Sequence, residues 1–330
     1  MKKEYKVKVF TGIRPTGSLT VANYLGAVEP ILNLTKKGIE PMVFVADLHA
    51  ITDEEPSVVQ KFINEIVVDY LALGLDPEKS VIFIQSTIKS QVFTLMSYLT
   101  RHITVAELLR VPTLKDKLKN KRGETANSFL FLYPVLMAAD ILIQRAEQVP
   151  VGKDQESHLE ISRLLARRFN DCYGNIFPIP KPYEIEALKI LSLKGEGKMS
   201  KSIPDGAIFL NDDIKSVTKK IKGAITSIEG KMTEGLESNI LLAKGLAKRE
   251  EDKVAIDKVV SEHMAGKKVM GEFKNILVKI VSEFLTDFQE KRERIINNKG
   301  LIKSVLEKGT KIATENANKT MAIVEKAMFK

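Results

Sequence analysis

A loop that presents two lysines is the clearest candidate for binding a polyphosphate. Residues 195–202 read GEGKMSKS, so Lys198 and Lys201 stand three residues apart with hydroxyl side chains beside them. Ammonium groups at this spacing can grip a polyphosphate without forming a covalent bond, and such clamps stabilise the charge that develops during transfer. The alternative interpretation is a solvated, charged linker.

A second candidate lies near the start of the chain, where residues 11–23 read TGIRPTGSLTVAN. The segment follows a predicted strand and opens a predicted helix, the place where open α/β sheets bind ligands. Gly12 and Gly17 allow close approach to the backbone, and a helix start offers N–H groups to phosphate. The segment is neither GxGxxG nor a P-loop. The alternative is an ordinary turn with Thr20 as an N-cap.

The elements that must position these segments alternate regularly along the chain. Strands are predicted over 6–10, 42–46, 81–85 and 148–151. Helices are predicted over 20–36, 56–73, most of 90–142, and 154–169. This alternation predicts an α/β fold with a doubly wound, Rossmann-like parallel sheet.

The character of the chain changes from about Leu210 onward, where strand-like runs vanish and charged residues alternate with apolar ones at helical spacing. We therefore predict a Rossmann-like catalytic domain over residues 1–205 and an all-helical second domain over 206–330. The pattern leaves open whether the last helix packs on the helical domain or returns to the sheet.

The composition bounds the class of partner. The chain has 330 residues and a formal net charge of +9, from 51 Lys and Arg against 42 Asp and Glu. Such an excess favours a polyanionic partner about as much as a lysine-rich solvated surface. The single cysteine, Cys172, excludes a disulfide framework within the chain and a metal site of clustered thiolates. No secretory signal and no membrane span are predicted, so the expected compartment is the cytoplasm.

The motifs together resemble a known family. KMSKS at 198–202 lies far downstream of TVAN at 20–23, which stands where HIGH is usual, with MAAD at 137–140 and VPVGKDQ at 149–155 between them. This order resembles the class I aminoacyl-tRNA synthetases, and among them the bacterial tryptophanyl-tRNA synthetase family, over essentially the whole chain.

The resemblance implies both a reaction and its partners. The chain would use ATP with Mg²⁺ to convert L-tryptophan into tryptophanyl-adenylate and pyrophosphate, and then transfer the tryptophanyl group to tRNA(Trp). Mg²⁺ would arrive with ATP, so the protein needs no metal site of its own. The helical domain would bind the anticodon arm, and a homodimer is expected.

The resemblance also implies an ATP site. The carried-over residues are Arg14, Pro15, Thr16, Ala22, Asn23, Gly152, Lys153, Asp154, Ile190, Lys198, Met199, Ser200, Lys201 and Ser202. Thr20 and Asn23 replace the two histidines of HIGH and, with Lys198 and Lys201, are predicted to be catalytic. Ala22 departs from the glycine usual at its position, and its methyl group is expected to push adenine outward or to weaken ATP binding.

Three further roles in the ATP site follow from the same alignment. Asp154 would accept hydrogen bonds from the ribose hydroxyls, and the backbone of Ile190 would contact adenine. Lys115 and Lys117 would help to bind the phosphates.

Specificity for the amino acid is predicted to rest on one helix. Tyr133, Met137 and Asp140 share a helix face at spacings of four and three residues, so Asp140 can accept the indole N–H while Met137 contacts the ring. The other predicted tryptophan-binding residues are Phe10, His49, Val149, Val151 and Gln155. Without the resemblance, a helix with a core methionine and a capped aspartate would explain the pattern.

Three alternatives compete with this interpretation. A tyrosyl-tRNA synthetase shares the fold and reaction but usually has a glutamine where this chain has Met137. An adenylyl transferase that does not use tRNA would not need a basic helical domain. A binding protein that had lost catalysis would not need Lys198 and Lys201.

Overall fold

The computed structural model describes residues 5–120, 126–151, 156–185, 188–195 and 197–329. Gly152, Lys153, Asp154 and Gln155, four of the predicted site residues, lie outside these ranges. No helix in the described ranges is long and apolar enough to span a membrane.

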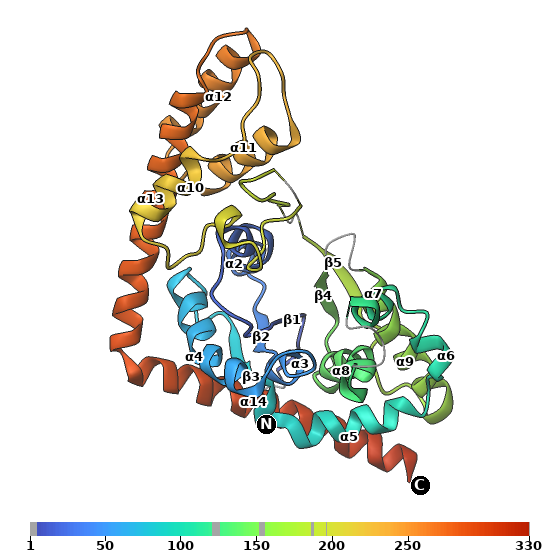
Figure 1. Cartoon of the computed structure of the whole chain (residues 1–330). Helices are drawn as coiled ribbons and strands as arrows, with labels where there is room; N and C mark the ends of the chain where they lie inside the picture. The colour runs from blue at the N-terminus through green and yellow to red at the C-terminus, as the bar shows by residue number, and fades with distance from the viewer. Residues whose placement is uncertain (1–4, 121–125, 152–155, 186–187, 196, 330) are drawn as a thin grey trace.

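A five-stranded parallel sheet with strand order β3-β2-β1-β4-β5 forms the centre of the molecule (Figure 1). The strands are β1 (Val9–Ile13), β2 (Pro41–Val45), β3 (Val81–Ile84), β4 (Gln148–Val151) and β5 (Lys181–Glu184). The chain leaves β1 toward β2 and β3 on one side and later crosses back to β4 and β5 on the other. The predicted doubly wound, Rossmann-like sheet is therefore confirmed.

Apolar residues cover both faces of the sheet, as the nearly all-apolar central strands predict. Val43 and Val45 pack with the helices that follow β1 and β2, whereas Met42 and Phe44 pack with helices on the opposite face. All five residues of β2 are buried. Alternate residues of a strand point to opposite faces, so this one strand contributes to both halves of the core.

The helices of the sheet region have the following bounds. They are α1 (Val21–Asn23), the π-helical turn η1 (Tyr24–Val28), α2 (Glu29–Lys36), α3 (Asp47–Ala50), α4 (Pro56–Ala72), η2 (Gln85–Ile88), α5 (Lys89–Thr100), α6 (Val105–Leu108), α7 (Pro112–Asn120), α8 (Ser128–Ile143), α9 (Glu156–Tyr173) and η5 (Pro204–Gly206). The helices predicted over 20–36 and 56–73 are confirmed.

The strand predictions fail at two places, one where the bounds are wrong and one where a strand was not predicted. The strand predicted over residues 6–10 is wrong in its bounds, because β1 begins at Val9 and continues through Gly12 to Ile13, where it pairs with Val45 of β2. Gly12 and Ile13, the first two residues of the turn-rich stretch predicted to follow the strand, are part of it. β5, which pairs with β4, was not predicted because Lys181–Glu184 is half exposed and carries a proline.

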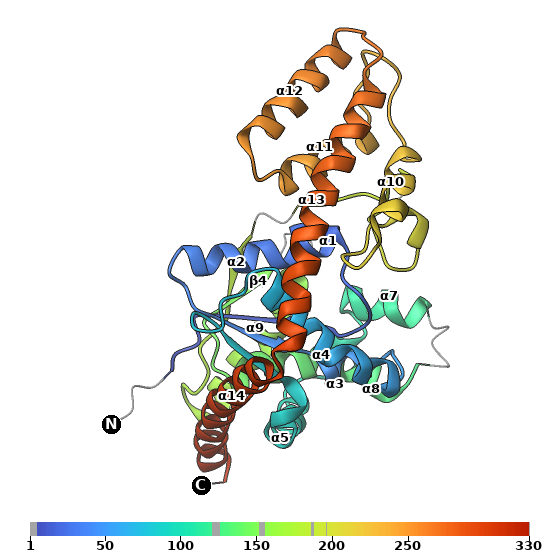
Figure 2. The same ribbon diagram turned by 90° about the vertical axis from the view of Figure 1, so that its left-hand side faces the viewer.

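Only helices follow Leu210 in the described part of the chain. They are α10 (Ile214–Lys222), α11 (Glu234–Leu246), α12 (Glu250–Met264), α13 (Met270–Asn297) and α14 (Lys299–Met328). Figures 1 and 2 show α10, α11, α12 and the first part of α13 projecting away from the sheet, while α13 runs back toward it. Arg292 of α13 donates a hydrogen bond to Asp69 of α4 at 2.6 Å, which fastens this long helix to the sheet region.

The last helix, α14, lies along the sheet rather than on the projecting helices (Figure 1). Ala313 and Ala317 of α14 belong to the core on the face of Met42 and Phe44. Gln144 at the end of α8 donates a hydrogen bond to the Ala313 carbonyl oxygen at 3.1 Å. Gly309 lies so close to β3 that a Cβ atom there would overlap the Ile82 carbonyl oxygen.

Replacing Gly309 with alanine is expected to lower the free energy of unfolding by about 1–3 kcal/mol, because the added methyl group forces α14 away from β3. Urea unfolding monitored by circular dichroism measures the change. Gly271→Ala in α13 is the matched control, since a Cβ there meets no atom within 4 Å. That control is expected to stabilise the chain by up to about 1 kcal/mol through helix propensity. Equal midpoints for both variants would contradict the packing of α14 on β3.

Candidate active site

Two cavities meet at the carboxyl ends of β1 and β4. One has a volume of about 430 Å³ and the other about 690 Å³, and Thr11, Gly12 and Pro150 line both of them. The carboxyl edge of a parallel sheet is where open α/β folds bind ligands. If one molecule occupied each cavity, the two molecules would therefore come closest to each other above Gly12. Gly12 is required there because a Cβ would overlap the Phe44 ring.

The smaller cavity holds the residues predicted to bind an aromatic amino acid. Its lining includes Phe10, His49, Tyr133, Met137, Asp140, Val149 and Val151. The structure therefore brings together every predicted member of this group that lies in the described ranges. Tyr133 is fixed by a hydrogen bond of 2.5 Å between its hydroxyl and that of Thr113 on α7.

Asp140 is the only carboxylate that lines this cavity among the described residues, and its side chain is only 2% exposed. Nε2 of Gln85 donates to both carboxylate oxygens, at 2.8 and 2.7 Å, and His49 Nε2 lies 2.9 Å from Oδ2. Burial raises the pKa of Asp140 above its usual value, while the hydrogen bonds from His49 and Gln85 act in the opposite direction. A carboxylate can accept further hydrogen bonds, so Asp140 can still accept one from a ligand N–H.

Gln85 is a site residue that sequence reasoning missed. Its side chain is fully buried, and its Oε1 accepts hydrogen bonds from the backbone N–H groups of Leu48 and His49 at 3.0 and 3.2 Å. Gln85 thus fixes Asp140 on one side and the start of α3 on the other. The available signal was its position, since a glutamine that directly follows an apolar strand faces the carboxyl edge of the sheet.

Replacing Gln85 with leucine is expected to raise the KM for the aromatic amino acid by about ten-fold, because Asp140 loses a donor and two backbone N–H groups lose an acceptor. Steady-state activation assays measure the change. The KM for ATP should stay within about two-fold, since Gln85 does not line the larger cavity. Gln60→Leu on the exposed surface of α4 is the control, since it makes the same substitution away from both cavities. An unaltered KM for the amino acid would contradict the positioning role.

The larger cavity collects residues from the predicted ATP site. Ala22, Asn23, Ile190, Lys198 and Met199 line it. Gly26 lines it as well, from the π-helical turn one turn beyond Ala22. Such turns are rare and often occur at functional sites. Ala22 stands where glycine is usual in the family, and Gly26 brings bare backbone to the wall of the same cavity.

Thr20 and Asn23 bond to each other in a capping box. The Thr20 hydroxyl and backbone N–H both donate to Oδ1 of Asn23, and the Asn23 N–H donates to the Thr20 hydroxyl at 3.2 Å. Thr20 is 1% exposed and lines neither cavity, whereas Nδ2 of Asn23 remains available to a ligand. The geometry thus supports a ligand contact by Asn23 and a supporting role for Thr20.

The two lysines of the 195–202 loop occupy different environments. Lys198 is exposed at the mouth of the larger cavity. Lys201 is half-buried and donates to the Gly17 carbonyl oxygen at 2.7 Å, so this loop is tied to the turn after β1. Burial lowers the pKa of Lys201 below its usual value, although the nearby carboxylates of Asp69 and Glu54 oppose the change.

A three-residue ion network closes one side of the site. Asp53 pairs with Arg14, and Lys117 Nζ lies 2.6 Å from Oδ2 of the same carboxylate. Burial alone would raise the pKa of Asp53, but Lys117 and Arg14 outweigh it and hold the pKa below the usual value. Arg14 and Lys117 both line the smaller cavity. Sequence reasoning missed Asp53, which holds both cations at the smaller cavity.

Other predicted residues line neither cavity. These are Pro15, Thr16, Lys115, Ser200, Lys201 and Ser202. Ser200 and Ser202 are 2.9 Å apart through their hydroxyl groups. The contribution of these residues to ligand binding stays a prediction.

Comparison with known proteins agrees with this geometry. Residues 2–301 match the family described as tRNA synthetases class I (W and Y). The chain is 35% identical to a tryptophan–tRNA ligase of Porphyromonas gingivalis, covering 96% of this chain and 97% of that protein. It is 37% identical to one from Corynebacterium glutamicum, with 96% and 93% covered.

Solved structures show the same relationship. The tryptophanyl-tRNA synthetase of Campylobacter jejuni, crystallised with ADP and tryptophan, superposes with a TM-score of 0.84 at 29% identity, covering 98% of this chain and all of that one. The tryptophanyl-tRNA synthetase of Mycoplasma pneumoniae gives a TM-score of 0.83 at 28% identity, with 98% of each chain covered.

Proposed function

Because this chain belongs to the class I tRNA synthetases for tryptophan and tyrosine, we propose how its residues divide the work of a tryptophan–tRNA ligase. The protein is an aminoacyl-tRNA synthetase: it activates L-tryptophan with ATP and transfers it to tRNA. The tyrosine alternative is not favoured, because the relatives at 34–37% identity are named for tryptophan. The observation that carries the assignment of residues is the junction of the two cavities at Thr11, Gly12 and Pro150.

We assign the smaller cavity to tryptophan. The indole ring would lie between Phe10, Met137 and Val149, with its N–H donated to Asp140. The carboxylate of the amino acid would then point toward Gly12. At that point Arg14 and Lys117 supply positive charge, held in place by Asp53.

We assign the larger cavity to the adenosine part of ATP. Ile190 and Met199 are buried against each other, with the Met199 N–H donating to the Ile190 carbonyl oxygen at 2.9 Å. This backbone pair would contact adenine, and Ala22 and Gly26 would form the opposite wall. The ribose contacts expected from Gly152, Lys153 and Asp154 stay a prediction, as does the tryptophan contact expected from Gln155.

The chemical step needs orientation and charge stabilisation rather than a protein nucleophile. An oxygen of the tryptophan carboxylate attacks the α-phosphorus, the bond to the bridging oxygen of pyrophosphate breaks, and pyrophosphate leaves with the electron pair. Lys198 and Lys201 would neutralise the charge that builds up on the departing phosphates. Asn23 Nδ2 would donate to a phosphate oxygen. Mg²⁺ would be carried by the phosphates of ATP as part of the substrate.

The wider assignments follow from the family resemblance and the charge of the chain. We propose that the helices beyond residue 206 bind the anticodon arm of tRNA(Trp), that the working form is a homodimer, and that the protein works in the cytoplasm. Residues 291–330 carry ten Lys and Arg against four Glu, but most of this stretch is α14, which lies along the sheet, so its charge does not by itself assign binding to the projecting helices. Light scattering at working concentration tests the dimer.

Amino-acid-dependent exchange between ATP and pyrophosphate is the decisive experiment. The purified chain is assayed with tryptophan, with tyrosine and with no amino acid. Exchange that depends on tryptophan alone is expected. Exchange with tyrosine would overturn the pocket assignment, and no exchange with either amino acid would indicate a protein that binds but does not activate.

A further inference from the structure

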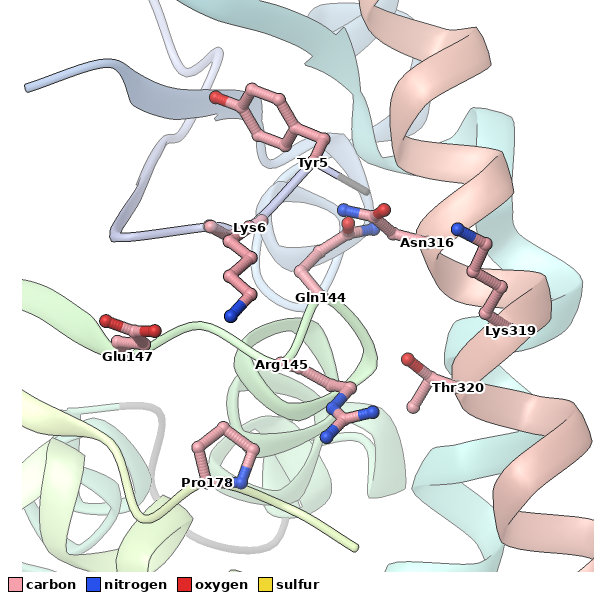
Figure 3. Close-up of a pocket in the computed structure, with 10 residues that line it drawn as sticks. Tyr5, Lys6, Gln144, Arg145, Glu147, Pro178, Asn316, Lys319 and Thr320 are labelled. Carbon is pink, nitrogen blue, oxygen red and sulfur yellow. The ribbon is translucent and has the colours of Figure 1, made fainter. Parts of the chain in front are cut away.

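A third cavity lies at the opposite edge of the sheet from the active site, beside the amino ends of β1 and β4 (Figure 3). Its volume is about 310 Å³. The backbone N–H of Glu147 donates to the Val7 carbonyl oxygen at 3.0 Å, which joins the two segments that form its floor. The length of β1 separates this cavity from Gly12 and the active site, a span on the order of 15 Å for a five-residue strand.

Basic side chains from three separate segments line this cavity. Lys6 precedes β1, Arg145 follows α8 and Lys319 lies on α14, as Figure 3 shows. The lining includes one acidic residue, Glu147, so the formal balance is +2. In the ranges that the structure describes, the side chains of Lys6 and Arg145 form no ion pair or hydrogen bond. Asn316 and Thr320 add an amide and a hydroxyl group.

The backbone of Arg145 has an unusual conformation that a different residue would adopt more easily. Arg145 has a φ of 50°, the only positive value for a non-glycine residue in the described part of the chain. Its N–H donates to the Leu142 carbonyl oxygen, and the Ala146 N–H donates to that of Ile141. This is the Schellman arrangement that ends many helices, and glycine is the usual residue at the left-handed position. The arginine therefore adds strain to the turn while placing a guanidinium at the cavity.

We propose that this cavity is a binding site for a phosphate dianion, either free orthophosphate or the phosphate group of a small ester. The balance of +2 matches the charge of the dianion. A guanidinium can bind two phosphate oxygens through its planar fork, and a lysine adds a compact charge beside it. The cavity is larger than phosphate alone, and the side chains of Tyr5 and Pro178 provide a partly apolar wall for the body of an ester. The site goes beyond the proposed function, since it shares no residue with either cavity of the active site.

Calorimetric titration of the full chain with inorganic phosphate, and separately with glycerol 3-phosphate, tests the proposal at constant ionic strength. Arg145→Gly is the central variant, because it removes the guanidinium and also relieves the left-handed turn. It is expected to weaken binding of both probes at least ten-fold while Tm stays equal or rises. Lys6→Ser is a second variant on the exposed chain before β1 and is expected to weaken binding several-fold. Tighter binding of glycerol 3-phosphate than of phosphate would identify the ester as the preferred form.

Lys201→Ala separates this site from the active site, since it disables the lysine clamp for ATP. Phosphate binding is expected to survive in that variant, whether or not adenylation is lost. Loss of phosphate binding in Lys201→Ala, but not in Arg145→Gly, would assign the ion to the active site and overturn the proposal. A variant Arg145→Gly that binds both probes normally but binds tRNA more weakly would also overturn it, and would assign the basic residues to an RNA surface.

Discussion

Replacing Lys201 with alanine is expected to lower the rate of tryptophanyl-adenylate formation by about 100-fold or more. The estimate follows from single-donor deletions at sites that stabilise developing charge. The hydrogen bond from Lys201 to the Gly17 carbonyl oxygen ties the loop to the turn after β1, beside the larger cavity to which we assign ATP. Single-turnover formation of the adenylate measures the rate directly. Tryptophan binding in the absence of ATP should be unaltered, because Lys201 does not line the tryptophan cavity.

Lys194→Ala is the matched control, since Lys194 is an exposed lysine from the same stretch of chain. Its rate should stay within about two-fold of the parent.

The pH dependence of the parent protein gives a second test of the role of Lys201. Burial lowers the pKa of Lys201, so the charged form is lost at a lower pH than for an ordinary lysine, and kcat/KM for ATP should fall as pH rises through that value. If Lys201→Ala changed only the KM for tryptophan, the phosphate-clamp role would be wrong.

Strand β2, which is buried on both faces, was predicted from its apolar run, and the half-buried strand β4 was predicted with its observed bounds as well. MVFVA is apolar at every position, and the structure has β2 over Pro41–Val45. The segment KVKVF alternates between charged and apolar residues, which indicates a strand. The alternation does not show at which residue the pairing with the neighbouring strand begins. Pairing with β2 starts at Val9 because the partner strand starts at Pro41. The end of β1 was predicted too early because Gly12 indicated a turn. Glycine is needed at this position within the strand because a Cβ atom there would overlap the Phe44 ring.

Side chains that line a cavity could be predicted from the sequence, whereas side chains that hold other side chains in place could not. Tyr133, Met137 and Asp140 follow from the spacing of one helix, and all three line the same cavity. Gln85 and Asp53 act through contacts between distant segments, 55 residues from Asp140 and 64 residues from Lys117. No local pattern contains such pairs. The capping box of Thr20 and Asn23 was visible as an alternative, and the structure shows that the cap forms.

Replacing Asp140 with alanine is expected to lower kcat/KM for tryptophan activation by ten-fold or more. The variant loses a charge-assisted hydrogen bond to the indole N–H, and hydrogen bonds to charged groups contribute about 1.5–3 kcal/mol, or roughly 10- to 150-fold. The KM for ATP should change by less than about two-fold, because Asp140 does not line the larger cavity. Exchange between ATP and pyrophosphate with varied tryptophan measures both constants. Asp171→Ala, at an exposed position on α9, is the control for loss of one acidic residue.

Selectivity separates recognition by Asp140 from a structural effect. In the parent protein phenylalanine leaves the buried carboxylate without a ligand donor, so it is disfavoured relative to tryptophan. Asp140→Ala removes the carboxylate, so the variant loses both the favourable contact with the indole N–H and the penalty against phenylalanine, and the ratio of tryptophan to phenylalanine activation should fall. The activity of the parent protein is expected to fall at acidic pH, and this fall should be absent from the variant. Burial raises the pKa of Asp140, so the accepting carboxylate is lost as pH falls through a value above that of an ordinary aspartate, and alanine has no such group to protonate. A variant that kept the parent's selectivity and its fall in activity at acidic pH would show that Asp140 does not recognise the indole.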